Sequence, residues 1–277
     1  MEWWQHLPEY INPNLVEIGT FQLRYYGAMY VVAFIVIYLL VLFRIKHEKL
    51  DFTKEDIQIF FLWGILGIMA GGRLGYVLFY DFDFFVDKPL KIICPFEISV
   101  TGFHYIGISG MSYHGGLIGI FLASIFFCRK YGKNFWRLAD LLSPAIPLGY
   151  TFGRIGNFIN GELYGRTTSV PWGMYFPSDP THQLRHPSQL YEAFFEGIFL
   201  FLILWSLRKR KLFDGYIFSL YLIGYGVARF FIEFLRKPDS QVGFIFGPFT
   251  MGQILCVCML FTGILIMIFK KPHISLH

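Results

Sequence analysis

The chain has 277 residues, of which 55% are hydrophobic and only 16% are charged, whereas a soluble domain of this length carries about 25% charged residues. Together with long apolar runs, this shortage of charge excludes an ordinary soluble domain and predicts a single polytopic membrane domain over residues 1–277. The net charge of +5 does not indicate a nucleic-acid partner, because the basic residues stand in short clusters between apolar runs, which is how membrane topology is encoded.

Seven apolar runs approach the roughly 20 residues that a helix needs to cross a bilayer. In chain order they cover about 24–43, 57–80, 112–129, 140–160, 189–207, 215–235 and 250–269. The predicted fold class is therefore an all-α integral membrane protein with about seven transmembrane helices. The fourth run contains Pro144 and Pro147 and is expected to be kinked or re-entrant, because membrane helices tolerate such interruptions where neighbouring helices pack closely.

Basic residues between the runs predict the orientation. They are concentrated after the first, third, fifth and seventh runs, at Arg44, Lys46, Lys49, Lys54, Arg129, Lys130, Lys133, Arg137, Arg208, Lys209, Arg210, Lys211, Lys270 and Lys271. The opposite segments carry half as many basic residues over longer stretches. The positive-inside rule therefore places the N-terminus outside and the C-terminus in the cytoplasm. Two longer segments, 81–111 and 161–188, then lie on the outer side, and the second, rich in Pro, Gly and Trp, is expected to form an ordered loop region.

Three arginines, Arg73, Arg154 and Arg229, fall inside predicted spans. A charged residue at the bilayer centre costs about 2.5–3.5 kcal/mol on insertion scales, so such residues usually face a polar cavity and mark function. The alternative for each is a side chain that reaches an interface or forms a structural ion pair.

The segment after Gly153 has the densest polar chemistry of the chain. Arg154 and Asn157 are three residues apart and share a helix face, and Glu162 and Gly165 follow at the predicted membrane exit. A guanidinium and an amide, with glycines that allow close backbone approach, are suited to binding a phosphate. The alternative is a polar helix end whose groups satisfy one another.

Two other runs add candidate groups. Arg229, Glu233 and Arg236 lie on one stripe of the sixth run, where an ion pair would lower the cost of burial. His114 opens the third run, and an imidazole there is a plausible proton acceptor, although a lone histidine is more often a structural donor. His186–Glu192 brings further polar groups to the start of the fifth run, in part as a helix cap.

No nucleophile motif, metal site or cofactor site is expected. The chain lacks G-x-S-x-G, H-E-x-x-H and a P-loop, and the four cysteines lack the spacing and histidine partners of a zinc site. The residues therefore favour an enzyme acting on a phospholipid headgroup, with the nucleophile supplied by a second substrate. A secondary transporter and a seven-helix receptor are rival hypotheses, although no internal repeat supports the first.

The chain resembles the prolipoprotein diacylglyceryl transferase family. Residues 153–165 read as its signature, G-R-x-G-N-F-x-N-x-E-x-x-G, without a departure. Further matching segments stand in the same order, at 25–27, 71–76, 114–116, 186–192 and 225–236. The resemblance thus runs from residue 25 to about 255.

The resemblance implies transfer of a diacylglyceryl group from phosphatidylglycerol to the lipobox cysteine thiol in the signal peptide of a bacterial prolipoprotein. A thioether forms and glycerol 1-phosphate leaves, as the first step of lipoprotein maturation, in the cytoplasmic (inner) membrane with the active site toward its outer face. It implies catalytic roles for His114, Arg229 and Tyr26. The substrate-binding residues implied are Arg154, Asn157, Gly165, Glu162, Tyr225, Glu233, Arg236 and Arg73.

Within that set, Arg154 is expected to anchor the headgroup with Asn157 and Tyr26. Arg229 is expected to stabilise the leaving phosphate, and His114 to accept the thiol proton. The remaining expectation is that Glu162 and Glu233 hold the arginines. The alternative assignment exchanges the roles of Arg154 and Arg229.

Overall fold

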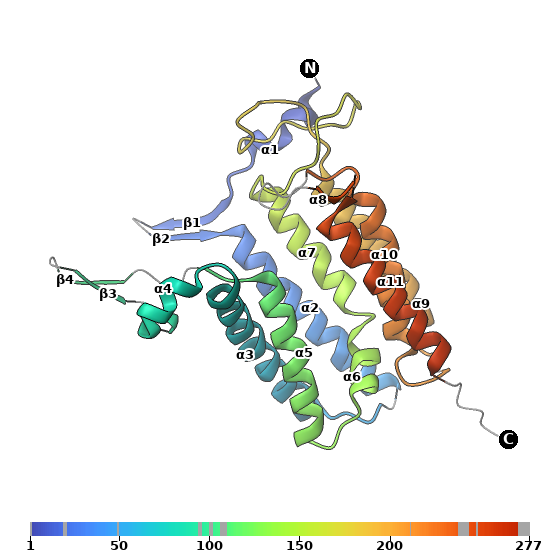
Figure 1. The fold of residues 1–277 in the computed structure, drawn as a ribbon. Helices are drawn as coiled ribbons and strands as arrows, with labels where there is room; N and C mark the ends of the chain where they lie inside the picture. The colour runs from blue at the N-terminus through green and yellow to red at the C-terminus, as the bar shows by residue number, and fades with distance from the viewer. Residues whose placement is uncertain are drawn as a thin grey trace. The chain divides into compact units, whose positions relative to one another are not determined.

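The computed structural model describes residues 2–18, 21–48, 50–93, 96–99, 102–105, 110–210, 212–237, 244–247 and 249–270. The chain divides into two compact units, one formed by Met1–Lys49 with Trp136–His277 and the other by Leu50–Phe135. Both are mostly helical (Figure 1).

The first unit is built around helices from the beginning, middle and end of the chain. They are η1 (Trp3–His6), α1 (Leu7–Tyr10), α2 (Tyr25–Glu48), α6 (Phe135–Leu142), α7 (Ile146–Ile159), α8 (Ser188–Glu192), the π-helix η3 (Ala193–Phe199), α9 (Leu200–Leu207), α10 (Tyr216–Ile232) and α11 (Met251–Phe269). Helix α2 packs along α7, and α10 packs along α11 (Figure 1). Segments that are distant in sequence thus meet around α7 and η3.

Two short hairpins also belong to the first unit. Strand β1 (Asn14–Ile18) pairs antiparallel with β2 (Phe21–Arg24), directly before α2. Strand β5 (Phe244–Phe246) pairs with β6 (Phe249–Thr250), directly before α11. Thr250 then caps α11 through a reciprocal capping box with Gln253. These hairpins are additions to the expected all-helical fold.

The second unit consists mainly of two long helices, α3 (Lys54–Phe79) and α5 (Tyr113–Lys130). Between them lie α4 (Phe82–Asp87), η2 (Pro89–Ile92) and a hairpin of β3 (Phe96–Ser99) with β4 (Gly102–Tyr105). Facing glycines let α3 and α5 approach closely: a Cβ on Gly75 would lie 2.7 Å from the Cα of Gly115. Such small-residue contacts are typical of helices packed in membranes.

Four helices of the described residues are long and apolar enough to cross a membrane: Tyr25–Glu48, Lys54–Phe79, Ser188–Leu207 and Met251–Phe269. Helix α10 is apolar but shorter. The expected mostly helical membrane protein is thus confirmed in its coarse form. The irregular fourth run, expected as one span over 140–160, is divided, because α6 ends at Leu142 and α7 begins at Ile146 after a break that contains Pro144.

A buried arginine joins α2 to α6 and α9 in the first unit. Arg44 is 1% exposed, and its Nη1 donates 2.7 Å hydrogen bonds to the backbone oxygens of Asp140 and Leu141 at the end of α6. Its Nε donates to Oε2 of Glu48 at 2.9 Å, and Nε of Arg208 donates to Oε1 of the same carboxylate at 2.8 Å. Arg44 therefore satisfies carbonyls that a helix end leaves without intrahelical partners.

The segment 161–188 is an ordered loop region that contains a buried ion pair. The fully buried Asp179 carboxylate accepts a 2.7 Å hydrogen bond from Nε of Arg185 and another from the hydroxyl of Thr181. Burial alone would raise the pKa of the Asp179 carboxyl, but the hydrogen bonds from Arg185 and Thr181 outweigh it and hold this pKa below its usual range. The loop also meets the N-terminus, where the backbone N–H of Tyr175 donates to the carbonyl of Gln5 at 2.7 Å.

Candidate functional site

Two arginines from different helices meet at one carboxylate in the first unit. Nη1 of Arg229, on α10, donates a 2.7 Å hydrogen bond to Oε2 of Glu192. Nε of Arg154, on α7, lies 2.9 Å from the same oxygen. The Glu192 side chain is fully buried, whereas Arg154 keeps 16% of its side-chain surface exposed. One carboxylate neutralises only one of the two guanidinium charges. The remaining positive charge can be neutralised by neighbouring groups or can bind an anion.

Arg154 continues into a second set of contacts on α7. Its Nη1 donates to Oδ1 of Asn157 at 3.1 Å, and Nδ2 of Asn157 donates to Oε1 of Glu162 at 2.8 Å. Glu162 is expected to hold an arginine, but it accepts a hydrogen bond from Asn157 instead, because it follows the end of α7 and reaches back to the last turn. The carboxylate that contacts Arg154 is Glu192.

Arg229 has its own carboxylate one turn further along α10. Nη2 of Arg229 lies 2.8 Å from Oε2 of Glu233, and Oγ1 of Thr250 donates to Oε1 of Glu233 at 3.0 Å. Nη1 of Arg236 lies 4.0 Å from Oε2 of Glu233. Glu233 therefore connects the arginine pair to the start of α11 and to Arg236.

Tyr150, Glu192 and Glu196 also belong to this cluster, although they are not among the site residues expected from the sequence. The Oη of Tyr150 lies 2.6 Å from Nε of Arg154, 2.7 Å from Oε2 of Glu196 and 3.0 Å from Oε2 of Glu192. The two glutamates are ionisable residues inside the apolar run 189–207, so the criterion that selects buried arginines also selects them when it is applied to acidic residues. Tyr150 carries no charge, so the main sequence feature that could identify it is its position four residues before Arg154, on the same helix face.

The two tyrosines expected at the site lie against α7 and its neighbours. The ring of Tyr225 packs edge-on against Tyr150, with the centroids 5.9 Å apart. The Oη of Tyr26, on α2, is 3.1 Å from Oη of Tyr30. Helix α7 approaches Tyr26 closely, because a Cβ on Gly156 would lie 3.5 Å from the Cα of Tyr26.

Gly165 lies where three backbone segments meet. Its N–H donates to the carbonyl of His186 at 2.8 Å, and the residue bridges to Arg236. A Cβ at this position would lie 2.5 Å from the backbone oxygen of Leu235 and 2.7 Å from Cβ of His186. The requirement for glycine here is therefore close backbone packing, which holds Arg236 against the loop region.

Arg73 belongs to the second unit and binds backbone there. Its Nε donates to the carbonyl of Ile92 at 2.8 Å, and its Nη2 donates to that of Lys91 at 2.7 Å. Its Nη1 donates to the carbonyl of Gly110 at 3.2 Å. These contacts join the end of η2 and Gly110 to α3, and a role for Arg73 in substrate binding stays a prediction.

His114 also belongs to the second unit, in the first turn of α5. Its side chain is exposed, and its ring lies edge-on to Tyr113 with the centroids 5.7 Å apart. Ser112 caps the helix by accepting a hydrogen bond from the N–H of Gly115 at 3.2 Å. Of the expected site residues, the structure brings together in the first unit Arg154, Asn157, Glu162, Arg229, Glu233 and Arg236, with Tyr225 next to Tyr150 and Tyr26 against α7.

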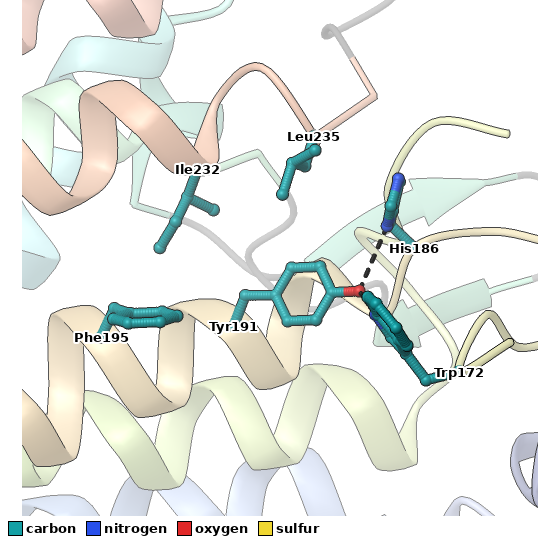
Figure 2. A pocket seen from close by; sticks show the side chains of 6 residues that line it. All are labelled: Trp172, His186, Tyr191, Phe195, Ile232 and Leu235. Carbon is teal, nitrogen blue, oxygen red and sulfur yellow. Dashed lines mark hydrogen bonds between the residues drawn. The ribbon is translucent and has the colours of Figure 1, made fainter. Parts of the chain in front are cut away.

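An apolar pocket of about 320 Å³ lies between the start of the fifth run, the end of α10 and the loop region (Figure 2). It is lined by Trp172, His186, Tyr191, Phe195, Ile232 and Leu235. The Oη of Tyr191 accepts a 2.8 Å hydrogen bond from Nε1 of Trp172 and lies 3.1 Å from Nδ1 of His186. Burial lowers the pKa of His186, which favours a neutral ring whose Nδ1 accepts a hydrogen bond from the Tyr191 hydroxyl. The pocket thus has one polar end and an apolar wall.

Comparison with known proteins gives a match to the family described as prolipoprotein diacylglyceryl transferase over residues 13–269. The chain belongs to this family. The prolipoprotein diacylglyceryl transferase match covers every residue of the arginine cluster, from Tyr150 to Thr250.

Relatives with this name are similar over nearly their whole length. The phosphatidylglycerol–prolipoprotein diacylglyceryl transferase of Chlorobaculum tepidum is 53% identical over 271 residues, which cover 98% of this chain and 94% of the relative. The protein of the same name from Campylobacter jejuni subsp. jejuni serotype O:23/36 is 43% identical, over 99% of this chain and 100% of the relative. That of Legionella pneumophila strain Lens is 44% identical, over 92% of this chain and 95% of the relative.

Proposed function

We propose that this chain transfers the diacylglyceryl group of phosphatidylglycerol to the thiol of a prolipoprotein lipobox cysteine. The bond between the glyceryl carbon and a phosphate oxygen breaks, the sulfur–carbon bond of a thioether forms, and glycerol 1-phosphate leaves. The observation that carries the proposal is the convergence of Arg154 and Arg229 on one buried carboxylate, in a chain of the prolipoprotein diacylglyceryl transferase family.

The arginine pair suits this reaction because the phosphate gains charge as it leaves. A phosphodiester carries one negative charge, and cleavage of its carbon–oxygen bond places another electron pair on the phosphate. Guanidinium donors already oriented by Glu192 stabilise that charge without reorganising. Arg154 has five N–H donors. The Nε donor faces Tyr150 and Glu192, and one Nη1 donor binds Asn157. The other donors of this partly exposed guanidinium can bind a phosphate oxygen.

We assign Arg154 to the headgroup, with Asn157 and Tyr26, and Arg229 to the leaving phosphate. The thiol supplies the nucleophile once it loses its proton, and His114 is our proposed acceptor. Its test is His114→Gln, assayed over a range of pH. A loss of activity with an altered pH profile supports the assignment, and full activity with an unchanged profile contradicts it.

The membrane-spanning helices and the family indicate a multi-pass bacterial membrane protein. Within that, we propose seven spans, an outer N-terminus, a cytoplasmic C-terminus and a site that faces the outer side of the cytoplasmic membrane. The distribution of basic residues between the apolar runs supports this orientation.

The experiment that tests the function uses the purified chain in vesicles that contain phosphatidylglycerol and a lipobox peptide. Transfer adds the mass of one diacylglyceryl group to the peptide, as mass spectrometry would measure. A peptide with serine in place of the lipobox cysteine, and vesicles of phosphatidylethanolamine alone, are the controls that should give no product. An unchanged peptide mass with the intact substrates would contradict the proposal and favour the transporter or receptor hypothesis.

A further inference from the structure

The hydroxyl of Tyr150 has more close polar neighbours than its single proton can serve. Nε of Arg154 donates to the Oη at 2.6 Å, and the same Oη lies 2.7 Å from Oε2 of Glu196 and 3.0 Å from Oε2 of Glu192. A phenol oxygen donates one hydrogen bond and accepts at most two. If both carboxyls were ionised, one of these oxygen–oxygen contacts would have no proton between its atoms. A second proton therefore has to come from a carboxyl.

The surroundings of the two glutamates identify which carboxyl carries that proton. Oε2 of Glu192 lies 2.9 Å from Nε of Arg154 and 2.7 Å from Nη1 of Arg229, so two guanidiniums stabilise its ionised form. Glu196 is also fully buried, but its contact with a guanidinium is longer, with its Oε1 3.7 Å from Nη1 of Arg229. When two carboxyls share a site, the one with weaker ionic partners stays protonated.

The charge of the whole cluster agrees with this assignment. Besides Arg154 and Arg229 it contains Arg236, which lies 4.0 Å from Glu233, and besides Glu192, Glu196 and Glu233 it contains Glu162, which is linked through Asn157. If all were ionised, four glutamates would outnumber three arginines, whereas with Glu196 neutral the charges balance. A phosphate that binds the arginines then meets no excess of negative charge.

We infer that Glu196 is a neutral carboxylic acid that donates its proton to Oη of Tyr150, and that it is thereby a positioning residue for Arg154. In this arrangement Tyr150 donates its own proton to Glu192 and accepts from Arg154 and Glu196, so each of the three close contacts of its Oη has one proton. The inference concerns the same site as the proposed transfer reaction, and its activity test rests on that function.

The backbone holds this arrangement by close packing of η3 on α7. Gly197, next to Glu196, lies so close to Thr151, next to Tyr150, that a Cβ on the glycine would collide with the threonine hydroxyl. Oγ1 of Thr151 also donates to the carbonyl of Ala193 at 3.3 Å. The contact occurs in a π-helix, a form that often occurs at functional sites.

The protonation state can be tested without substrate, by infrared difference spectroscopy on the whole chain in detergent free of phosphatidylglycerol. The difference spectrum of the wild type minus the Glu196→Gln variant is expected to contain the C=O band of a neutral carboxylic acid. The matched control is Glu55→Gln, at an exposed position on α3, whose difference should contain carboxylate bands alone. Carboxylate bands alone for Glu196→Gln, or a neutral-acid band for Glu192→Gln, would overturn the inference.

The activity test compares two replacements at position 196 in the vesicle assay. Glu196→Gln keeps an N–H donor for Tyr150 and is expected to lose about tenfold or less, whereas Glu196→Leu removes the donor and is expected to lose about 100-fold. Glu192→Gln is expected to lose at least about 100-fold, because it leaves two buried guanidiniums without their shared anion. A Gln variant at 196 as damaged as the Leu variant would contradict the positioning role.

Folding is checked by thermal unfolding of each variant in detergent. If Glu192→Gln does not fold, the two variants at position 196 and the infrared band still decide the question. If the wild type itself transfers nothing, the proposed function fails, and the infrared measurement alone supports or overturns the neutral state of Glu196.

Discussion

Replacing Arg154 by lysine tests the arginine cluster most directly, because the charge stays while the fork of donors is lost. Nε of Arg154 contacts Tyr150 at 2.6 Å and Glu192 at 2.9 Å, and its Nη1 contacts Asn157 at 3.1 Å. A lysine has one nitrogen at the end of a flexible chain, so it can keep the ion pair with Glu192 but not all three contacts.

The expected loss follows from those contacts. Hydrogen bonds to charged groups contribute about 1.5–3 kcal/mol each. The contacts with Tyr150 and Asn157 are lost and partly replaced, so we expect a net loss of about 3 kcal/mol, which is about 100-fold in kcat/KM. Orientation of the phosphate suffers as well as its binding, so kcat should fall and KM for phosphatidylglycerol should rise.

Initial rates of transfer to a lipobox peptide, measured by mass spectrometry at several phosphatidylglycerol fractions, separate these two parameters. The matched control is Arg137→Lys, because Arg137 is half exposed and pairs with Asp214 outside the cluster; it should leave the rate near that of the wild type. An Arg154→Lys enzyme that keeps the wild-type kcat and KM would refute the headgroup role. A thermal melt shows whether any loss arises from unfolding.

Three further predictions concern the packing around the site. Arg44→Met removes a buried partner of Glu48 and of two α6 carbonyls, and should lower stability by about 3–5 kcal/mol in detergent unfolding; an unchanged melting temperature would contradict this. The pKa of Asp179 is lower in the folded chain than in the unfolded one. The ionised carboxylate therefore stabilises the fold fully when the pH is above the unfolded-state pKa of about 4, and this contribution is lost as the pH falls below it. Asp179→Asn should therefore be less stable at neutral pH and should lose less stability on acidification than the wild type; parallel pH curves would argue against it. Gly197→Ala should cost about 1–3 kcal/mol by overpacking and should reduce transfer by moving Glu196 from Tyr150, and full activity would show that this distance is not critical.

Local spacing predicted much of the fold and part of the site. The final apolar run, expected at 250–269, is α11 at Met251–Phe269, because a continuous apolar run between polar segments has few alternatives. Arg154 and Asn157, and likewise Arg229 and Glu233, are neighbours on their own helices, so helical periodicity alone brings them together.

Other features depend on contacts between distant segments. Glu192 joins arginines that are 38 and 37 residues away, and helical periodicity carries no information about which helices pack together. The π-helix η3 changes the register within a run that reads as an ordinary apolar helix. The hairpins β1–β2 and β5–β6 consist of two short strands each, and such short runs carry little of the alternating pattern that predicts a strand.

The contacts of Arg44 also constrain the order in which the molecule is completed. Helix α2 is synthesised early, yet Arg208 follows Glu48 by 160 residues, and the α6 carbonyls follow Arg44 by 96 and 97. Before those segments have been synthesised, Arg44 and Glu48 lack these partners. The contacts that hold the end of α2 are therefore completed only once the chain has been made as far as Arg208.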